Sequence, residues 1–202
     1  MGALTKAESE RRFTYADYKS WDLKEGERCE LIRGRIVPMF GAATAMPRMD
    51  IRHQTVSRKI FLRLGNHLEG MSYQAFYAPL DVRLFYEEGE DENDDSVVQP
   101  DIMVVCDESK IGDEGIRGAP DLVIEILSPT DSATKMKRKH RLYQQSGVRE
   151  YWVVDPEDND VTVYCFSDGE IFSDKIYKAA DTVPVGILPG FGIELERVFA
   201  EV

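Results

Sequence analysis

The spacing of apolar residues predicts two long helices in this chain. From Ile51 to Leu68 the apolar residues recur at every fourth position, as on one face of a helix: Val56, Ile60, Leu64 and Leu68. A second helix is predicted from Ala133 to Ser146, because capping residues precede it and Gly147 follows it. A short amphipathic helix is expected from Tyr15 to Trp21.

Shorter apolar runs predict β-strands. The segment 30–39 reads as a hairpin that turns at Arg33-Gly34. Further strands are expected over 73–77, 80–86, 97–105, 121–128, 150–154 and 161–166, with short strands to the C-terminus. The glycine-rich segment 111–118 is expected to be a connector. Strands with two interleaved helices predict an α/β or α+β fold, in which helices flank one mixed sheet in a single domain over residues 1–202.

Composition narrows the class of protein. Apolar residues make up 43% of the chain and charged residues 31%, as in ordinary globular proteins. No apolar run approaches the roughly 20 residues of a membrane span, and the polar N-terminus resembles no signal peptide. Cys29, Cys106 and Cys165 form no CxxC pair, so we expect reduced thiols in a cytoplasmic protein.

The net charge of −12 argues against nucleic acid as a partner, but seven of the acids lie in one block at 87–95. Such a block is usually a solvated loop, and weak calcium binding is the alternative, although the spacing of an EF-hand loop is missing. A DNA-binding face would need a local cluster of cations. The candidates lie around the first long helix: Arg48, Arg52, Arg58, Lys59 and Arg63.

One carboxylate stands inside an apolar strand. Glu125 is surrounded by Val, Ile and Leu over 121–128, which indicates a strand covered on both faces. An ionised carboxylate there costs several kcal/mol unless a cation or strong donors meet it. Glu125 therefore calls for a partner, and a divalent metal ion is one candidate.

Asp101 is the candidate second carboxylate. Pro100 fixes the start of an apolar strand, and Asp101 follows it directly. Alone, such an Asp is often a turn residue. Paired with Glu125, it offers the oxygen ligands that a hard cation such as Mg²⁺ or Mn²⁺ prefers. Asp121 shares a strand face with Glu125 but lies about 13 Å away at ~3.3 Å per residue, so a structural role is expected for it.

Three further side chains are candidates. On the second helix, Met136, His140 and Tyr143 share an arc that we expect to be buried, and Lys139 lies at the border of this arc. From there Lys139 could reach Glu125, or it could belong to the solvated face of the helix. Glu30 could point a third carboxylate inward or lie on the surface of the hairpin. His53 could be a ligand or a satisfied core residue.

The pattern resembles a known family. Gln99-Pro100-Asp101, the strand around Glu125, and the segment 143–156 are similar to the Uma-type endonucleases of the PD-(D/E)XK superfamily, over about residues 15–195. The resemblance implies a restriction-endonuclease-like αβββαβ core with an extra N-terminal helix and hairpin. One departure is Leu127, which stands where the superfamily has its strand lysine; Lys139 matches the helix lysine of the related family.

The resemblance implies a Mg²⁺-dependent endonuclease that hydrolyses DNA phosphodiesters, with a homodimer as the expected assembly. Asp101 and Glu125 match its metal ligands, Lys139 its catalytic lysine, and Glu30 an additional acidic position. The alternative is a non-catalytic binding or regulatory protein on the same scaffold, favoured by the acidic charge and Leu127. A carboxylate-pair glycosidase is a third reading, but no aromatic-lined sugar cleft is evident.

Overall fold

The structure is a computed structural model that describes residues 11–22, 28–39, 50–129 and 131–200. Its helices are α2 (Tyr15–Lys19), α3 (Ile51–Leu68), α4 (Ala133–Ser146) and α5 (Leu195–Phe199), with a short 3-10 turn at Glu108–Lys110. Two six-stranded sheets and one two-stranded sheet carry the strands. No helix in these ranges has both the length and the apolar character that crossing a bilayer demands.

The larger layer, called the central sheet here, has the order β12-β11-β10-β9-β6-β3. Its strands are β3 (Gln74–Tyr77), β6 (Ile102–Val105), β9 (Leu122–Ile126), β10 (Glu150–Asp155), β11 (Asp160–Ser167) and β12 (Glu170–Lys178). β9 and β10 are parallel, and the other neighbours are antiparallel. Taken in chain order, α3, β3, β6, β9, α4 and β10 give the expected αβββαβ core.

The second sheet has the order β2-β1-β5-β4-β8-β7. Its strands are β1 (Cys29–Ile32), β2 (Arg35–Pro38), β4 (Val82–Arg83), β5 (Val97–Val98), β7 (Ile111–Gly112) and β8 (Gly115–Arg117). The α/β prediction and the mixed central sheet are confirmed, but the prediction of only one mixed sheet missed this layer. It is built from two- to four-residue strands, which leave little periodicity in a sequence.

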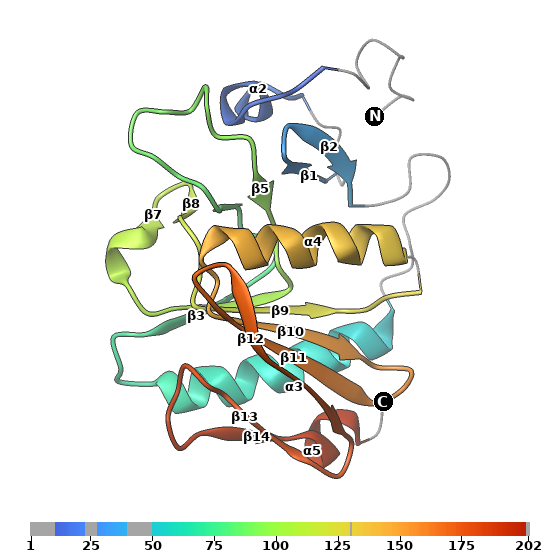
Figure 1. Cartoon of the computed structure of the whole chain (residues 1–202). Helices are drawn as coiled ribbons and strands as arrows, with labels where there is room; N and C mark the ends of the chain where they lie inside the picture. Colours follow the sequence, from blue (N-terminus) through green and yellow to red (C-terminus); the bar gives the residue numbers. More distant parts are fainter. Residues whose placement is uncertain (1–10, 23–27, 40–49, 130, 201–202) are drawn as a thin grey trace.

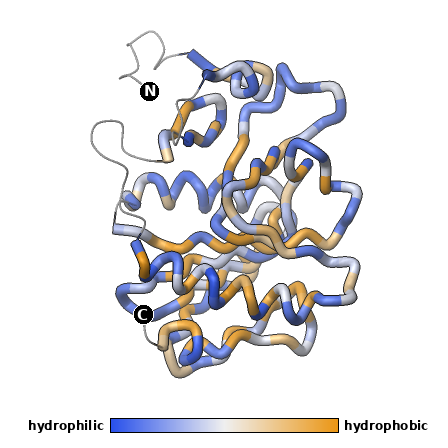
Figure 2. The backbone as a smooth tube through the Cα atoms, turned by 180° about the vertical axis from the view of Figure 1, so that it is seen from behind, coloured by the Kyte–Doolittle hydropathy of each residue, from blue (hydrophilic) through white to orange (hydrophobic). Residues whose placement is uncertain are grey.

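The two faces of the central sheet are covered differently (Figure 1). α4 and the second sheet pack on one face, where Met103, Val123 and Tyr151 are buried. On the other face α3, α5 and the pair β13 (Thr182–Pro184) and β14 (Gly192–Glu194) bury the alternate residues of the same strands. Figure 2 shows the resulting concentration of apolar residues in the central strands.

The two long helices have the predicted bounds. The four residues spaced by four on α3 are buried, and Asp50 caps its N-terminus by accepting a hydrogen bond from the Arg52 amide. α4 begins after Ser132, whose hydroxyl accepts from the Lys135 amide, and ends at Gly147 with φ +94°. The hairpin β1–β2 turns at Arg33-Gly34, as predicted.

Several shorter elements differ from the prediction. The strand expected over 97–105 is broken at 99–101, and its halves, β5 and β6, belong to different sheets. The expected connector 111–118 forms the hairpin β7–β8. The strand expected over 80–86 is reduced to β4, and the C-terminal segment, where only short strands are expected, holds the nine-residue β12 and the helix α5.

The acidic block 87–95 is more than a solvated loop. Asp94 is buried, and its carboxylate accepts a hydrogen bond of 2.7 Å from Nε of Arg83. Asp91 accepts from the same guanidinium at 2.7 Å and pairs with Lys19 of α2 at 2.5 Å. The guanidinium also stacks on the Tyr15 ring. Part of the negative charge is therefore used to hold the N-terminal helix against the second sheet.

Candidate active site

The predicted site residues come together on the face of the central sheet that α4 covers. Lys139 is buried at the centre, with its Nζ 2.8 Å from Oε1 of Glu125 in β9 and 2.8 Å from Oε1 of Glu30 in β1. Lys139 and Glu30 therefore both point into the protein, and neither lies on the solvated surface. A single ammonium group joins the two sheets and α4.

The buried side of α4 is rotated slightly from the predicted arc. Lys139, Leu142 and Tyr143 are buried, whereas Met136 and His140 are half-buried. The predicted arc of Met136, His140 and Tyr143 leaves out Leu142, which is buried. Lys139, predicted at the border of the arc, lies inside the buried side, where two carboxylates compensate its charge.

Glu125 is buried in the strand β9. It faces α4, opposite Val153 in the parallel neighbour β10. Its Oε1 also accepts a hydrogen bond of 2.6 Å from the Tyr143 hydroxyl, a partner that the sequence did not single out. The pKa of Glu125 is raised to about 7, chiefly by burial; the charge of Lys139 opposes this rise, and the carboxylates of Asp101 and Glu30 add to it.

Lys139 stays charged despite its burial. Burial alone lowers the pKa of this ammonium, but the neighbouring charges of Glu125 and Glu30 outweigh burial and raise it. The Tyr143 hydroxyl stays protonated, because burial and the charge of Glu125 raise its pKa well above the ordinary value. The cluster thus combines an ammonium and a hydroxyl donor with more carboxylate charge than the ammonium neutralises.

Asp101 lies at the break between β5 and β6, next to Glu125. β6 and β9 pair with Ile102 opposite Ile124, so extending that register by one residue places Asp101 opposite Glu125. Opposite residues of regular antiparallel strands have Cα atoms about 4.5–5.5 Å apart. Oδ2 of Asp101 accepts a hydrogen bond of 2.8 Å from the Ile126 amide, which holds the carboxylate beside the end of β9.

His53 adds a contact that sequence reasoning left unassigned. It lies in the first turn of α3, with Nε2 3.3 Å from Oδ2 of Asp101. Burial lowers its pKa, but the hydrogen bond and charge of Asp101 outweigh burial and raise it. The only sequence signal was a histidine on the apolar side of a helix, and nothing in the sequence related it to Asp101, 48 positions away.

Asp121 is separate from this cluster, as expected. One of its oxygens accepts a hydrogen bond of 2.8 Å from the Cys106 amide, and the other lies 3.2 Å from the Arg149 guanidinium. Its contacts explain a structural role at the start of β9.

The three cysteines, Cys29, Cys106 and Cys165, are free in the structure, in line with the reduced thiols that the sequence predicts.

A divalent cation fits the chemistry of the pair Asp101 and Glu125. In the described ranges no three His, Cys, Asp or Glu side chains form a cluster suited to a metal. Mg²⁺, however, is often held by one or two carboxylates and keeps several waters. Oε2 of Glu30 is also buried without a hydrogen-bond partner among the described residues, which adds to the negative character of the site.

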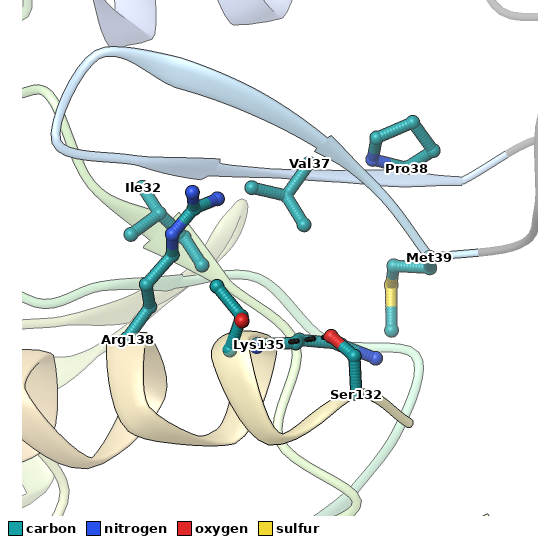
Figure 3. Close-up of a pocket in the computed structure, with 8 residues that line it drawn as sticks. Ile32, Val37, Pro38, Met39, Ser132, Lys135 and Arg138 are labelled. Atoms are coloured by element: carbon teal, nitrogen blue, oxygen red, sulfur yellow. Dashed lines mark hydrogen bonds between the residues drawn. The ribbon is translucent and has the colours of Figure 1, made fainter. Parts of the chain in front are cut away.

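Cations of α4 flank the buried cluster at the surface. Lys137, Arg138 and Arg141 are exposed, and none of them pairs with an acid of the described chain. On one side of the helix, a groove of about 330 Å³ separates α4 from the hairpin β1–β2, and Arg138 reaches across it toward Ile32 (Figure 3). These free cations stand out in a protein with a net charge of −12.

The cationic cluster expected around α3 is only partly described. Arg48 lies outside the described residues. Lys59 donates a hydrogen bond to the Ala200 carbonyl, and Arg63 donates to the Lys59 carbonyl at 2.7 Å. Arg58 is exposed and Arg52 is half-buried. Two of the four described members thus make contacts with backbone carbonyls.

Known proteins share the fold of this chain. A solved structure of a protein described as "a putative nuclease belonging to DUF820", from Anabaena variabilis, matches with a TM-score of 0.67 and 22% identity. The match covers 93% of this chain and 97% of the other, and it shows a shared fold.

Two curated proteins from Synechocystis sp. are also similar. "Uncharacterized protein sll1609" is 28% identical over 145 residues, which are 70% of this chain and 74% of that protein. "Uncharacterized protein slr1290" is 24% identical over 166 residues, or 82% of this chain and 80% of that protein. The family model Uma2, described as "Putative restriction endonuclease", matches residues 15–196, nearly the whole chain. The chain therefore belongs to the Uma2 family.

Proposed function

We propose that this protein is a metal-dependent DNA endonuclease of the PD-(D/E)XK type. The observation that carries the proposal is the meeting of Asp101, Glu125 and the buried Lys139 on the face of the central sheet that α4 covers, where β6 and β9 are neighbours. The family description and the nuclease-like fold of the Anabaena protein support the same reaction class. We propose further that residues 1–202 act as one domain.

The carboxylates of Asp101 and Glu125 would hold Mg²⁺ or Mn²⁺. A bound divalent ion supplies Lewis acidity toward a phosphodiester and acidifies water. The residues of the chain position that chemistry: the Ile126 amide and His53 fix the orientation of Asp101, while Tyr143 and Lys139 fix that of Glu125.

Lys139 replaces the missing strand lysine. Position 127, where the superfamily pattern has a lysine, is Leu, but the ammonium group arrives from α4 and reaches Glu125 directly. A fixed positive charge beside the scissile phosphate would orient the attacking water or stabilise charge that develops in the transition state. Glu30 would act by holding Lys139 in place.

DNA is the proposed substrate because unpaired cations flank the site. Arg138 lies on the groove side of α4, and Lys137 and Arg141 line a cavity on its other side, so a phosphate backbone could be held beside the cluster. A homodimer would present two such sites, one for each strand of a duplex. Light scattering of the purified protein tests that assembly.

The function is tested by cleavage of supercoiled plasmid DNA in Mg²⁺ or Mn²⁺. Asp101→Asn and Glu125→Gln are expected to lower the rate by at least about 100-fold. Asp121→Asn is the matched control, because it changes an Asp just before β9 whose carboxylate, among the described residues, contacts only the Cys106 amide and Arg149. Cleavage that survives both site substitutions would remove these carboxylates from the mechanism.

The rival is a non-catalytic binding protein on the same scaffold. One observation favours it: the ammonium of Lys139 already contacts Glu125 and Glu30, as in a structural ion-pair network. Calorimetry with Mn²⁺ distinguishes the nuclease from the binding protein, because a non-catalytic scaffold should not bind Mn²⁺ through Asp101.

A further inference from the structure

The strand β12 forms one edge of the central sheet and is exposed along its length. It pairs with β11 on one side, and within the described ranges no strand pairs with its other side. Eight of its nine residues are exposed. Such an edge presents backbone N–H and C=O groups that no neighbour satisfies, and proteins usually shorten, cover or bend edges of this kind. An open strand of nine residues is therefore a candidate site for pairing with another strand.

Exposed apolar side chains are concentrated on this strand. Among the described residues seven large apolar side chains are exposed, and three of them, Ile171, Phe172 and Ile176, belong to β12. The exposed fraction is 67% for Phe172 and 56% for Ile176. Apolar side chains that gather at one place on a surface mark a site of protein contact more often than isolated ones do.

The regular part of β12 is its C-terminal half. From Ser173 to Lys178 the pairing with β11 is regular. The register then shifts by one residue, and Phe172 lies opposite no residue of β11. A bulge of this kind bends a strand and disturbs its ladder of hydrogen bonds. A further strand would therefore pair with the regular segment 173–178.

The side chains of this segment complement those of a second copy of the same strand. When two copies of a strand pair antiparallel about a two-fold axis, one residue lies opposite itself, and residues equally far on either side of it oppose each other. With Ile176 on the axis, Asp174 of each copy lies opposite Lys178 of the other, and the two Ile176 side chains meet. Opposite charges and apolar pairs at facing positions stabilise a sheet.

Other registers of the same pair are less favourable. With Asp174 on the axis two carboxylates would face each other, and with Lys175 or Lys178 on the axis two ammonium groups would do so. Like charges at facing positions destabilise a sheet. With Tyr177 on the axis, Ile176 would face Lys178, and a register centred further toward the N-terminus would include the bulge. The charges thus favour the register centred on Ile176.

The two charged groups of this register are accessible. Lys178 pairs with Asp160 at 2.7 Å, but its side chain is 66% exposed and an ammonium group has three hydrogens to donate. Asp174 is exposed and makes no ion pair with another residue of the described chain. Lys178 can therefore keep Asp160 and also contact Asp174 of a second copy.

We infer that β12 pairs antiparallel with β12 of a second copy of this chain, with Ile176 at the two-fold axis. The pairing joins the two central sheets edge to edge and covers the exposed Ile176 side chains. This inference assigns an interface to the homodimer proposed above and does not depend on the proposed chemistry of the carboxylates.

Sedimentation velocity of the full-length protein tests the interface. The wild type is expected to be a dimer. Ile176→Lys is expected to raise the dissociation constant of the dimer at least about tenfold, because two ammonium groups would face each other at the axis. Leu62→Lys is the matched control, since it introduces the same charge at an exposed apolar position of α3 and should dimerise like the wild type.

Charge exchange tests the register. Asp174→Lys places a lysine opposite Lys178, and Lys178→Asp places an aspartate opposite Asp174, so each variant alone should dimerise more weakly than the wild type. The double variant with both substitutions has opposite charges at the facing positions again and should regain the dimer. An equimolar mixture of the two single variants should form a heterodimer for the same reason.

Disulfide formation measures the distance between the two strands. The Cα atoms of facing residues in an antiparallel pair are about 4.5–5.5 Å apart, which a disulfide can bridge. Oxidised Ile176→Cys should therefore migrate as a covalent dimer in a non-reducing gel. Glu170→Cys is the control, because Glu170 lies six residues from the axis and its two copies would be about 40 Å apart at ~3.4 Å per residue. The wild type controls for the native thiols.

The outcomes separate this interface from the other proposals. A monomeric wild type would refute the inference and leave the edge of β12 to a strand of a different protein. A dimer that Ile176→Lys does not weaken, and that Ile176→Cys does not cross-link, would retain the homodimer and refute this interface. A cross-linked dimer of a wild type that cleaves no plasmid would retain the interface and refute the nuclease.

Discussion

Glu125→Gln should change how the stability of the protein depends on pH. The carboxyl group of Glu125 has a pKa of about 7, against an ordinary value of 4.5, chiefly because it is buried. The folded state therefore holds a proton on Glu125 between about pH 4.5 and 7, where the unfolded chain has released it. Stability contributed by the protonated form is complete below pH 4.5 and is lost as the pH rises to 7.

The magnitude follows from the size of that difference. One pKa unit corresponds to 1.36 kcal/mol, so ionising Glu125 in the folded protein costs about 3 kcal/mol. Glutamine has nearly the shape of the protonated side chain and does not titrate. The wild type and Glu125→Gln should therefore have similar unfolding free energies at pH 4, and the variant should be more stable by about 3 kcal/mol at pH 8.

Urea unfolding at a series of pH values measures this difference directly. Glu170→Gln is the control, because it makes the same substitution at an exposed position of β12 and should follow the wild type at every pH. Mg²⁺ favours the ionised carboxylate and should reduce the difference at pH 8. If the curves of wild type and Glu125→Gln run parallel from pH 4 to pH 8, the burial argument for Glu125 is wrong.

Three further predictions concern charges in the described structure. Lys139→Met should lower the unfolding free energy by about 3–5 kcal/mol in urea denaturation, because two buried carboxylates lose their cation; a loss under 1 kcal/mol would contradict this. Arg83→Ala should cost about 3 kcal/mol in the same assay, since it leaves Asp94 buried and unpaired, and a neutral result would argue against the docked acidic loop. Saturating Mn²⁺ at 100 times its Kd should stabilise the wild type by about 2.7 kcal/mol in thermal unfolding but leave Asp101→Asn unchanged; equal shifts would place the ion elsewhere.

The elements that the sequence predicted best are those with a long repeat. α3 and α4 were predicted with their observed bounds, because both combine helical periodicity with capping residues. The second sheet escaped prediction because its strands are two to four residues long and pair with partners distant in sequence. The break at 99–101 has a different cause: Gln99-Pro100-Asp101 separates two apolar runs, and Pro100 has no amide hydrogen to donate to a sheet.

The site was predictable where one residue was anomalous by itself. Glu125 stands out in an apolar strand, and Lys139 follows from the geometry of its helix. Glu30 was ambiguous, because a hairpin glutamate is usually exposed and its contact with Lys139 joins residues more than 100 positions apart. The contact of His53 with Asp101 depends on tertiary packing alone.

The ammonium of Lys139 touches β1 in one sheet and β9 in the other. A partly folded chain in which the layers have not yet docked lacks this bridge, and its carboxylates remain hydrated and apart. The constellation thus requires both sheets and α4 to be docked together, and any opening between these layers would dismantle it.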